Sequence, residues 1–524
     1  MSQEVFHYGE DFLTASKALA LSCGELKGEL SKTAREGIRK CQQIVEDITE
    51  SDQAVYGINT GFGPLCTTRV SAADTKKLQE NILKSHAVGT GDPIPTSIAA
   101  LMLVLKVHAL AKGFSGIQEA TIDRIIWHID QAAIPVVPKQ GSVGASGDLA
   151  PLSHLFLPLI GYGKLDYKGK RRDAETVLSE LNQEPLKLNG KEGLALINGT
   201  QFMAAHAVTA VIKMQNLIAS ADLIGAMMIE GLTGSARPFL PQLHKIRPFK
   251  GNRHTAETVT NLLTNSEVVQ SHAGCTRVQD PYSLRCMPQV HGASWNAWLH
   301  LKETVEIEIN SVTDNPIVFD DGSTISGGNF HGQPIALPMD YACLAASEIG
   351  NISDRRIYLS LMGNYPGVPK LLLKETGLNS GFMIVQYTSA ALASENKSLC
   401  YPASADSIPT SMGQEDHVSM GSISGRKLLT VIDNVERVLG LELFCAAQAL
   451  DFHAPLRPTP ILDGLQKHIR KQIPHITEDE LINDYMHHAI NFVKNADLVK
   501  LAKEISAISG APYRTTLSNL FDEF

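Results

Sequence analysis

Apolar residues recur at helical spacing in the second half of the chain. From residue 428 onward, with no proline among them, they fall at Leu428, Val431, Ile432, Val435, Leu439, Leu443, Ala446 and Leu450. A period near 3.6 residues over about seven turns predicts one long helix with an apolar face. The segment Met203–Glu230 is apolar nearly all round, its charged residues being Lys213, Asp222 and Glu230. This segment predicts a helix that is surrounded by other helices.

Further helical patterns outnumber strand patterns. The helical ones run over Ser97–Lys112, Trp295–Ile309, Tyr341–Met362 and Thr477–Ile505. Strand patterns lie in short segments that alternate around a turn dipeptide, namely Gly163–Arg172 around Lys168-Gly169 and Ile317–Ser326 around Asp321-Gly322. We therefore expect a mainly α-helical protein, built of long bundle helices with minor β-hairpins.

The 524 residues are enough for about three average domains, or for one large helical unit with an appendage. No fixed-period repeat and no flexible linker interrupts the chain, which favours tightly docked domains. We place one boundary, between an N-terminal domain over residues 1–199 and a central and C-terminal helical bundle over residues 200–524.

Composition and charge favour a soluble protein that binds small molecules. Apolar residues make up 44% and charged residues 19% of the chain, as in ordinary globular proteins. The net charge of -9, without a basic run, gives no electrostatic footprint for nucleic acid or an anionic membrane. The uncharged stretch Gly193–Ile212 is long enough to span a bilayer, but its Asn198, Thr200, Gln201 and His206 predict a place in the protein interior.

The N-terminus and the cysteines favour the cytoplasm. Glu4, Glu10 and Asp11 precede any apolar run, unlike the start of a secretory signal. The eight cysteines form no C-x-x-C pair and no metal-finger spacing, so we expect reduced and mostly buried thiols. No His-Glu-x-x-His pattern occurs, and the neighbours His487-His488 would point about 100° apart on a helix, so we predict no metal site.

The densest run of small residues is Gly141–Leu152, read as GSVGASGDLAPL, just before an apolar segment. Its second half predicts a helix start, because Asp148 can cap free backbone N–H groups and Pro151 is tolerated in a first turn. A phosphate cradle does not fit, since no Lys-Ser/Thr follows the glycines and the Rossmann spacing is absent. A plain glycine-rich turn into a helix remains one interpretation.

A second interpretation is chemical. In Ala145-Ser146-Gly147 the side chains are so small that the backbone nitrogen of Gly147 can approach the carbonyl of Ala145 with little steric resistance. If that ring closes and two waters leave, Ser146 becomes a dehydroalanine-like methylene. The loop would then be an electrophile that no ordinary side chain supplies.

This segment resembles the prosthetic-group motif of the aromatic amino acid ammonia-lyases. In that family Ala-Ser-Gly forms 4-methylideneimidazol-5-one (MIO) autocatalytically. Further segments similar to the family occur in the same order across most of the chain: Tyr56–Gly63 (YGINTGFG), Asn198–Gln201 (NGTQ), Gln279–Cys286 (QDPYSLRC), Gly328–Gly332 (GNFHG) and Gln414–Met420 (QEDHVSM).

The resemblance implies a fold and an assembly. It implies the mainly helical fumarase/aspartase-like fold, with the MIO loop in the N-terminal domain and a long-helix bundle after it. It also implies a homotetramer whose active sites are shared between subunits. The small-molecule partner would be an amino acid, from which the enzyme, a carbon–nitrogen lyase, removes ammonia and a β-proton.

The resemblance also implies roles for single residues. The methylene derived from Ser146 would capture the substrate amine, and Tyr56 would take the β-proton, although Tyr282 is also a candidate for proton handling. Arg285 fits the substrate carboxylate, because a planar guanidinium can hold both oxygens. The residues that remain as contacts of the substrate or of MIO are Ser85, His86, Asn198, Gln279, Phe330 and Glu415. Asp148 either orients the loop or caps the following helix, and we favour the cap.

Two places favour the branch of the family that converts L-histidine to trans-urocanate in histidine catabolism. They are Ser85-His86, followed by Ala-Val-Gly, and Glu415 after Gln414; the stretch Gly377–Lys397 is also similar to that branch. An imidazole needs polar partners that a phenyl ring does not, so a buried carboxylate at Glu415 suits histidine. A tyrosine hydroxyl could also use His86, which makes Glu415 the sharper discriminator.

One residue departs from the histidine branch. Gly413 stands where we expect asparagine before Gln-Glu-Asp, and it could loosen the loop that holds Glu415. The alternatives to the histidine branch are a tyrosine or phenylalanine ammonia-lyase, an MIO aminomutase, or, from a different class, an inactive relative kept as an oligomeric binding or scaffold protein. The intact Ala145-Ser146-Gly147, Tyr56 and Arg285 argue against the scaffold.

Overall fold

The computed structural model describes residues 5–51, 54–61, 63, 70–274 and 277–522. The chain divides into two compact units that interleave along the sequence. The first comprises residues 1–209, 301–340 and 402–426, and the second comprises residues 210–300, 341–401 and 427–524. The single boundary between residues 199 and 200 stays a prediction about folding domains, because these units are groups of contacts and not separate stretches of chain.

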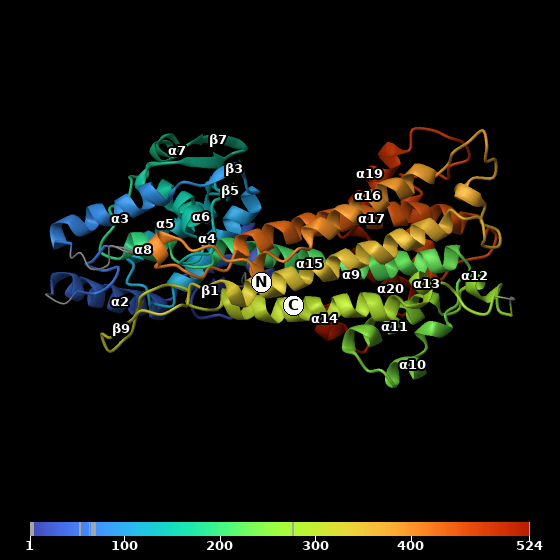
Figure 1. Cartoon of the computed structure of the whole chain (residues 1–524), viewed down its shortest axis with the longest axis horizontal. Coiled ribbons are helices and arrows are strands. Elements are labelled where there is room, and N and C mark those ends of the chain that lie inside the picture. Colours follow the sequence, from blue (N-terminus) through green and yellow to red (C-terminus); the bar gives the residue numbers. More distant parts are fainter. Residues whose placement is uncertain (1–4, 52–53, 62, 64–69, 275–276, 523–524) are drawn as a thin grey trace. The chain divides into compact units, whose positions relative to one another are not determined.

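Long helices dominate the structure, as the sequence predicts (Figure 1). The longest continue from one unit's residues into the other's; they are α9 (Gln201–Gly231), α14 (Met287–Ile309), α15 (Gln333–Ser360) and α17 (Gly421–Asp451). The predicted helices over 428–450, 203–230, 295–309 and 341–362 fall on these four.

The first unit holds shorter helices and all the described strands. Its helices are α1 (Ala15–Ser22), α2 (Lys32–Glu50), α3 (Ala72–His86), α4 (Thr96–Leu110), α5 (Glu119–Asp130), α6 (Leu149–Phe156), α7 (Ala174–Glu180) and α8 (Glu192–Ile197), with 3₁₀ turns η2 (Leu157–Ile160), η5 (Ala403–Ala405) and η6 (Ser411–Gly413). Helix α4 confirms the pattern predicted over Ser97–Lys112 and is buried from Ile98 to Leu110.

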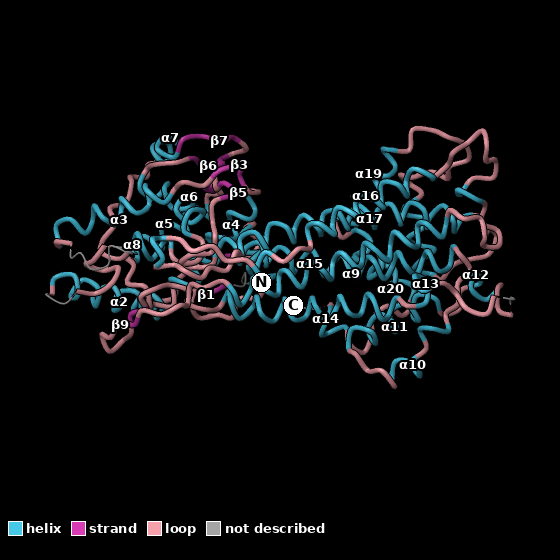
Figure 2. The backbone as a smooth tube through the Cα atoms, viewed as in Figure 1, coloured by secondary structure: helices cyan, strands magenta, loops and turns pink. Residues whose placement is uncertain are grey.

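The strands form small sheets, drawn as short magenta segments in Figure 2. The pairs are parallel β1 (Val5–His7) with β2 (Lys27–Glu29), and antiparallel β3 (Thr90–Pro93) with β5 (Pro138–Gln140), β4 (Ile134–Pro135) with β6 (Lys164–Tyr167), β6 with β7 (Lys170–Asp173), and β8 (Ile317–Val318) with β9 (Thr324–Ile325). Both predicted hairpins occur. The turn at Lys168-Gly169 has φ values of 50° and 72°, which suit a two-residue hairpin loop, and β4 extends that hairpin to a three-stranded sheet.

In the second unit, parts of α9, α14, α15 and α17 run alongside one another (Figure 1). Trp298 of α14 donates to the Val211 carbonyl of α9 at 2.8 Å, and the buried Arg356 of α15 pairs with Glu442 of α17. The remaining elements here are η3 (Arg237–Phe239), α10 (Pro241–Lys245), α11 (Lys250–Leu263), α12 (Glu267–Gln270), α13 (Tyr282–Arg285), η4 (Lys370–Leu372), α16 (Met383–Leu399), α18 (Pro460–Ile469), α19 (Asn483–Lys494), α20 (Asp497–Ser509) and α21 (Ser518–Phe521).

Helix α9 is the core helix that its apolar sequence predicts. It is long and apolar enough to cross a membrane, yet 78% of its most apolar window is buried inside the protein. The helix predicted over Thr477–Ile505 is wrong in part. The chain is irregular up to residue 482 and then forms α19 and α20, which are separated where Ala496 adopts a left-handed φ of 61°. A left-handed residue breaks the helical hydrogen-bond ladder, and side-chain periodicity does not reveal it.

The described cysteines are all free. Cys41, Cys343, Cys400 and Cys445 are buried, Cys286 is half-buried and Cys23 is exposed, in agreement with mostly buried thiols. Cys66 and Cys275 lie outside the described residues.

Candidate active site

The small-residue loop makes a sharp turn before α6. Gly144, Ser146 and Gly147 have φ values of 81°, 50° and 79°, all in the left-handed region. This conformation is easy for glycine but costs a serine on the order of 1 kcal/mol or more. The turn is therefore held by its surroundings.

The clamp on this loop is the backbone of Gly199, in the turn between α8 and α9. The Gly199 N–H donates to the Ser146 carbonyl at 3.2 Å, and the Asp148 N–H donates to the Gly199 carbonyl at 2.8 Å. A Cβ on Gly147 would lie 2.0 Å from the Gly199 oxygen. Only glycine at position 147 permits this approach, since the backbone oxygen cannot move away without breaking the clamp.

Asp148 does not cap α6 with its side chain, so our preference for that role was wrong. Its buried carboxylate instead accepts hydrogen bonds from the Ser142 hydroxyl at 2.9 Å and from the Met203 N–H at 3.0 Å. Asp148 thus connects the start of the loop, through Ser142, to the first turn of α9, through Met203. Burial raises the pKa of Asp148 to about 7, an effect that these hydrogen bonds partly offset.

Glu415 lies beside the turn of the loop. Its Oε1 accepts a hydrogen bond from the Ser146 hydroxyl at 3.2 Å, and its Oε2 accepts from the hydroxyls of Thr410 at 2.9 Å and Ser411 at 2.7 Å. The side chain is half-buried, and not fully buried as the sequence analysis assumed. Among the described residues, hydroxyl groups are therefore the hydrogen-bond donors to this carboxylate.

The loop that carries Glu415 is ordered by backbone hydrogen bonds although Gly413 lies within it. The φ of Gly413 is 86°, and a Cβ there would meet no atom within 4 Å. The backbone of Thr410 still pairs with that of Glu415, with the Thr410 N–H donating to the Glu415 carbonyl at 2.9 Å. Glycine and asparagine are the residues that adopt a left-handed φ most readily, so either suits position 413.

His86 is the last residue of α3 and is half-buried. Its Nδ1 lies 3.0 Å from the hydroxyl of Ser85. Burial lowers the pKa of His86, and the charge of Glu415 opposes that shift, which places the two side chains in one electrostatic neighbourhood. At neutral pH the imidazole is therefore mainly uncharged and can donate or accept a hydrogen bond.

Asn198 lies at the C-terminal end of α8, beside the clamp residue Gly199. Its side-chain nitrogen donates to the Asn315 carbonyl at 2.8 Å and to Asp314 Oδ1 at 3.3 Å. Its amide oxygen is buried and has no hydrogen-bond partner among the described residues. An anchored amide with one unused oxygen is suited to contact a ligand.

The remaining sequence-predicted residues of the first unit are half-buried. The Tyr56 hydroxyl accepts a hydrogen bond from the Gly63 N–H at 3.4 Å, while Phe62 of that motif lies outside the described residues. Phe330 precedes His331, whose ring stacks on that of His417 at 5.8 Å.

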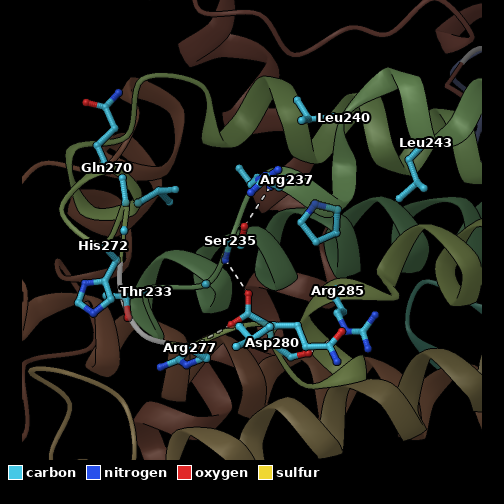
Figure 3. A pocket seen from close by; sticks show the side chains of 18 of the residues that line it. Thr233, Ser235, Arg237, Leu240, Leu243, Gln270, His272, Arg277, Asp280 and Arg285 are labelled. Carbon is cyan, nitrogen blue, oxygen red and sulfur yellow. Dashed lines mark hydrogen bonds and ion pairs between the residues drawn. The ribbon is translucent and has the colours of Figure 1, made fainter.

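Gln279, Tyr282 and Arg285 belong to the second unit. Gln279 and Arg285 line a pocket of about 930 Å³ (Figure 3). The Arg285 Nε donates to the Asp280 carbonyl at 2.8 Å, and its guanidinium lies 4.7 Å from the centre of the exposed Tyr282 ring.

The buried Asp280 carboxylate fixes this segment. It accepts from the Ser235 N–H at 2.7 Å and from Arg277 at 3.0 Å (Figure 3). Asp280 lies within the Gln279–Cys286 motif, but neither the motif nor the resemblance implied a role for it. The sequence signal that could have identified Asp280 is its position between Gln279 and Tyr282, two residues that were predicted to contact the ligand.

The chain matches the family model described as aromatic amino acid lyase over residues 13–471. A histidine ammonia-lyase of Anaeromyxobacter sp. (strain K) is 46% identical over 90% of this chain and 95% of its own length. One from Bacillus cereus is 44% identical over 91% of this chain and 94% of its own length.

Solved structures agree with these relatives. Histidine ammonia-lyase from Trypanosoma cruzi has a TM-score of 0.89 and 38% identity, covering 99% of this chain and 97% of that one. Tyrosine aminomutase from Streptomyces globisporus has a TM-score of 0.90 and 30% identity, covering 96% and 99%. The likeness confirms the predicted mainly helical fold, and this chain belongs to the aromatic amino acid lyase family.

Proposed function

We propose that this enzyme eliminates ammonia from L-histidine to give trans-urocanate. The observation that carries the proposal is the Glu415 carboxylate beside the Ala145-Ser146-Gly147 loop. Glu415 is hydrogen-bonded to Ser146, and the charge of Glu415 acts on His86. An imidazole ring can hydrogen-bond to Glu415 Oε1, which loses its Ser146 partner when that hydroxyl leaves, whereas a phenyl ring cannot. Relatives named histidine ammonia-lyase at 43–47% identity support the choice.

We infer that Ala145-Ser146-Gly147 cyclises to MIO. The residues fit that group, because the left-handed turn at Ser146 and Gly147 folds the backbone sharply on itself without side chains in the way. The Gly147 nitrogen would bond to the Ala145 carbonyl carbon with loss of one water. The Ser146 hydroxyl would leave with its α-hydrogen as the second water. Once formed, the group supplies an electron-poor alkene carbon that makes the amine a better leaving group.

The chain's own side chains would supply the acid–base chemistry. A substrate CH₂ is a very weak acid, so a base must stand close to it. We assign that base to Tyr56, with Tyr282 as the other candidate. The unused amide oxygen of Asn198 would accept a hydrogen bond from the substrate or from a group of the loop. Phe330 would pack against the substrate ring or the loop.

Arg285 would hold the substrate carboxylate with both guanidinium arms, with Gln279 and Tyr282 beside it. Its Nε is already bound to the Asp280 carbonyl, which fixes the plane of the guanidinium and leaves its terminal nitrogens for a ligand. We propose that these residues complete the site in a cytoplasmic homotetramer, in which different subunits contribute to one active site.

The test is incubation of the purified protein with L-histidine while following urocanate absorbance. Ser146→Ala is measured in parallel, together with the intact mass of both proteins. We expect urocanate from the wild type, a mass lower by two waters, and almost no turnover with an intact fold in the variant. Conversion of L-tyrosine or L-phenylalanine with none of L-histidine would replace this proposal by the corresponding lyase or, if a β-amino acid forms, by an aminomutase.

A further inference from the structure

Lys106 is a buried lysine that the proposed chemistry does not use. It lies in α4 at 2% exposure, in a helix whose other residues from Ile98 to Leu110 are also buried. Its Nζ donates to the backbone carbonyl of Asn198 at 2.5 Å and lies 3.5 Å from Oε1 of Gln201. The sequence carried a signal for it, since Lys106 is a charged residue that follows the uncharged, mostly apolar run Ser97–Leu105.

Stability alone does not explain this lysine. Burying an ammonium group is unfavourable unless a counter-charge is near, and an apolar residue would fill the same space without that cost. The nearby Lys191 is buried too, but it pairs directly with Asp314. Lys106 instead makes its hydrogen bonds to neutral oxygens, and burial lowers its pKa to about 7; Asp314 opposes that shift and Lys191 adds to it.

The oxygens that Lys106 binds lie on both sides of the clamp. Asn198 precedes Gly199 and Gln201 follows it, and the side-chain nitrogen of Gln201 donates to Thr313 at 3.0 Å. Gly199 itself has a φ of 124°, a conformation that only glycine adopts readily. The clamp is thus a turn between α8 and α9 that depends on glycine, and Lys106 binds a residue on each side of it.

We propose that Lys106 is a positioning residue for the Ala145-Ser146-Gly147 loop. It fixes the Asn198 carbonyl, and thereby the Gly199 groups that hold Ser146 and Asp148 and the direction in which the Asn198 amide points. Without this donor the buried Asn198 carbonyl has no hydrogen-bond partner. Because an unpaired buried carbonyl is unfavourable, the turn changes conformation so that the carbonyl gains another partner. The effect on turnover rests on the proposed function, whereas the effect on loop dehydration does not depend on the substrate.

The test compares Lys106→Met, which keeps the length but removes the donor, with Lys106→Arg, which keeps a cationic donor. Leu105→Ala is the matched control, because Leu105 is a neighbouring residue of α4 with 2% exposure whose truncation lowers stability but removes no side-chain hydrogen-bond donor. For each protein we would measure the melting temperature, the intact mass and the kcat and KM for L-histidine.

We expect Lys106→Met to fold, with part of the protein still carrying both waters and kcat lowered about 10- to 100-fold. Lys106→Arg should recover part of both losses, and Leu105→Ala should melt earlier while keeping full dehydration and kcat. Full dehydration and a near-normal kcat in Lys106→Met would overturn the proposal. The proposal would also be overturned if, in all three variants, the losses of dehydration and of kcat were proportional to the fall in melting temperature. Failure of both Lys106 variants to fold would overturn it as well. A wild type that is fully dehydrated yet inactive on L-histidine would refute the proposed substrate and leave the mass comparison valid.

Discussion

Replacing Glu415 by glutamine tests the choice of substrate with little structural disturbance. The side chain is half-buried and, once the Ser146 hydroxyl has left, is held by the hydroxyls of Thr410 and Ser411, which can rotate to accept as well as donate. The glutamine amide can therefore keep the local bonds while removing the charge. A hydrogen bond to a charged group contributes about 1.5–3 kcal/mol, so kcat/KM for L-histidine should fall about 10- to 150-fold.

The assay is steady-state urocanate formation, with the intact mass as a check that the loop still dehydrates. Glu36→Gln is the control, because it removes a carboxylate charge from an exposed ion pair on α2, where Glu36 lies 3.9 Å from Lys32. That variant should keep wild-type kinetics, since exposed pairs contribute little. If Glu415→Gln turns over L-histidine within about twofold of the wild type, the carboxylate does not recognise the imidazole and the argument for the substrate is wrong.

Three further variants test separate parts of the structure. Gly147→Ala should abolish dehydration in intact-mass spectra, because its Cβ would stand 2.0 Å from the Gly199 oxygen; a fully dehydrated variant would contradict the clamp. Arg285→Lys should raise KM for L-histidine about 10- to 100-fold in initial-rate assays, since a lysine cannot hold a carboxylate bidentately, and an unchanged KM would remove that role. Burial raises the pKa of Glu230 from 4.5 to about 8. Between these pH values Glu230 ionises in the unfolded state but stays protonated in the folded state, so the free energy of unfolding falls as pH rises. Glu230→Gln should remove this pH-dependent fall. In thermal melts from pH 5 to pH 9, the free energy of unfolding of the variant should rise relative to that of the wild type by at most about 5 kcal/mol and level off above pH 8. A difference in unfolding free energy that does not change with pH would show that Glu230 stays ionised in the folded state.

The long helices could be predicted because their signal is periodic and local. The apolar stripe from Leu428 to Leu450 lies within α17, and the turn dipeptide Lys168-Gly169 forms its hairpin. The split between α19 and α20 could not be predicted in this way. It depends on one left-handed residue, Ala496, whose side chain favours helix and gives no sign of the break.

The amino-acid sequence alone determines the loop of small residues and its capacity to cyclise. The small size of the side chains in Ala145-Ser146-Gly147 is a property of these residues and does not depend on a tertiary contact. Tertiary structure alone decided what shapes that loop. The Gly199 clamp, the attachment of Asp148 to α9 and the buried contact of Lys106 with Asn198 join segments that lie far apart in the chain. A buried polar group takes whichever partner the packing brings to it, and side-chain spacing along the chain does not record which partner that is.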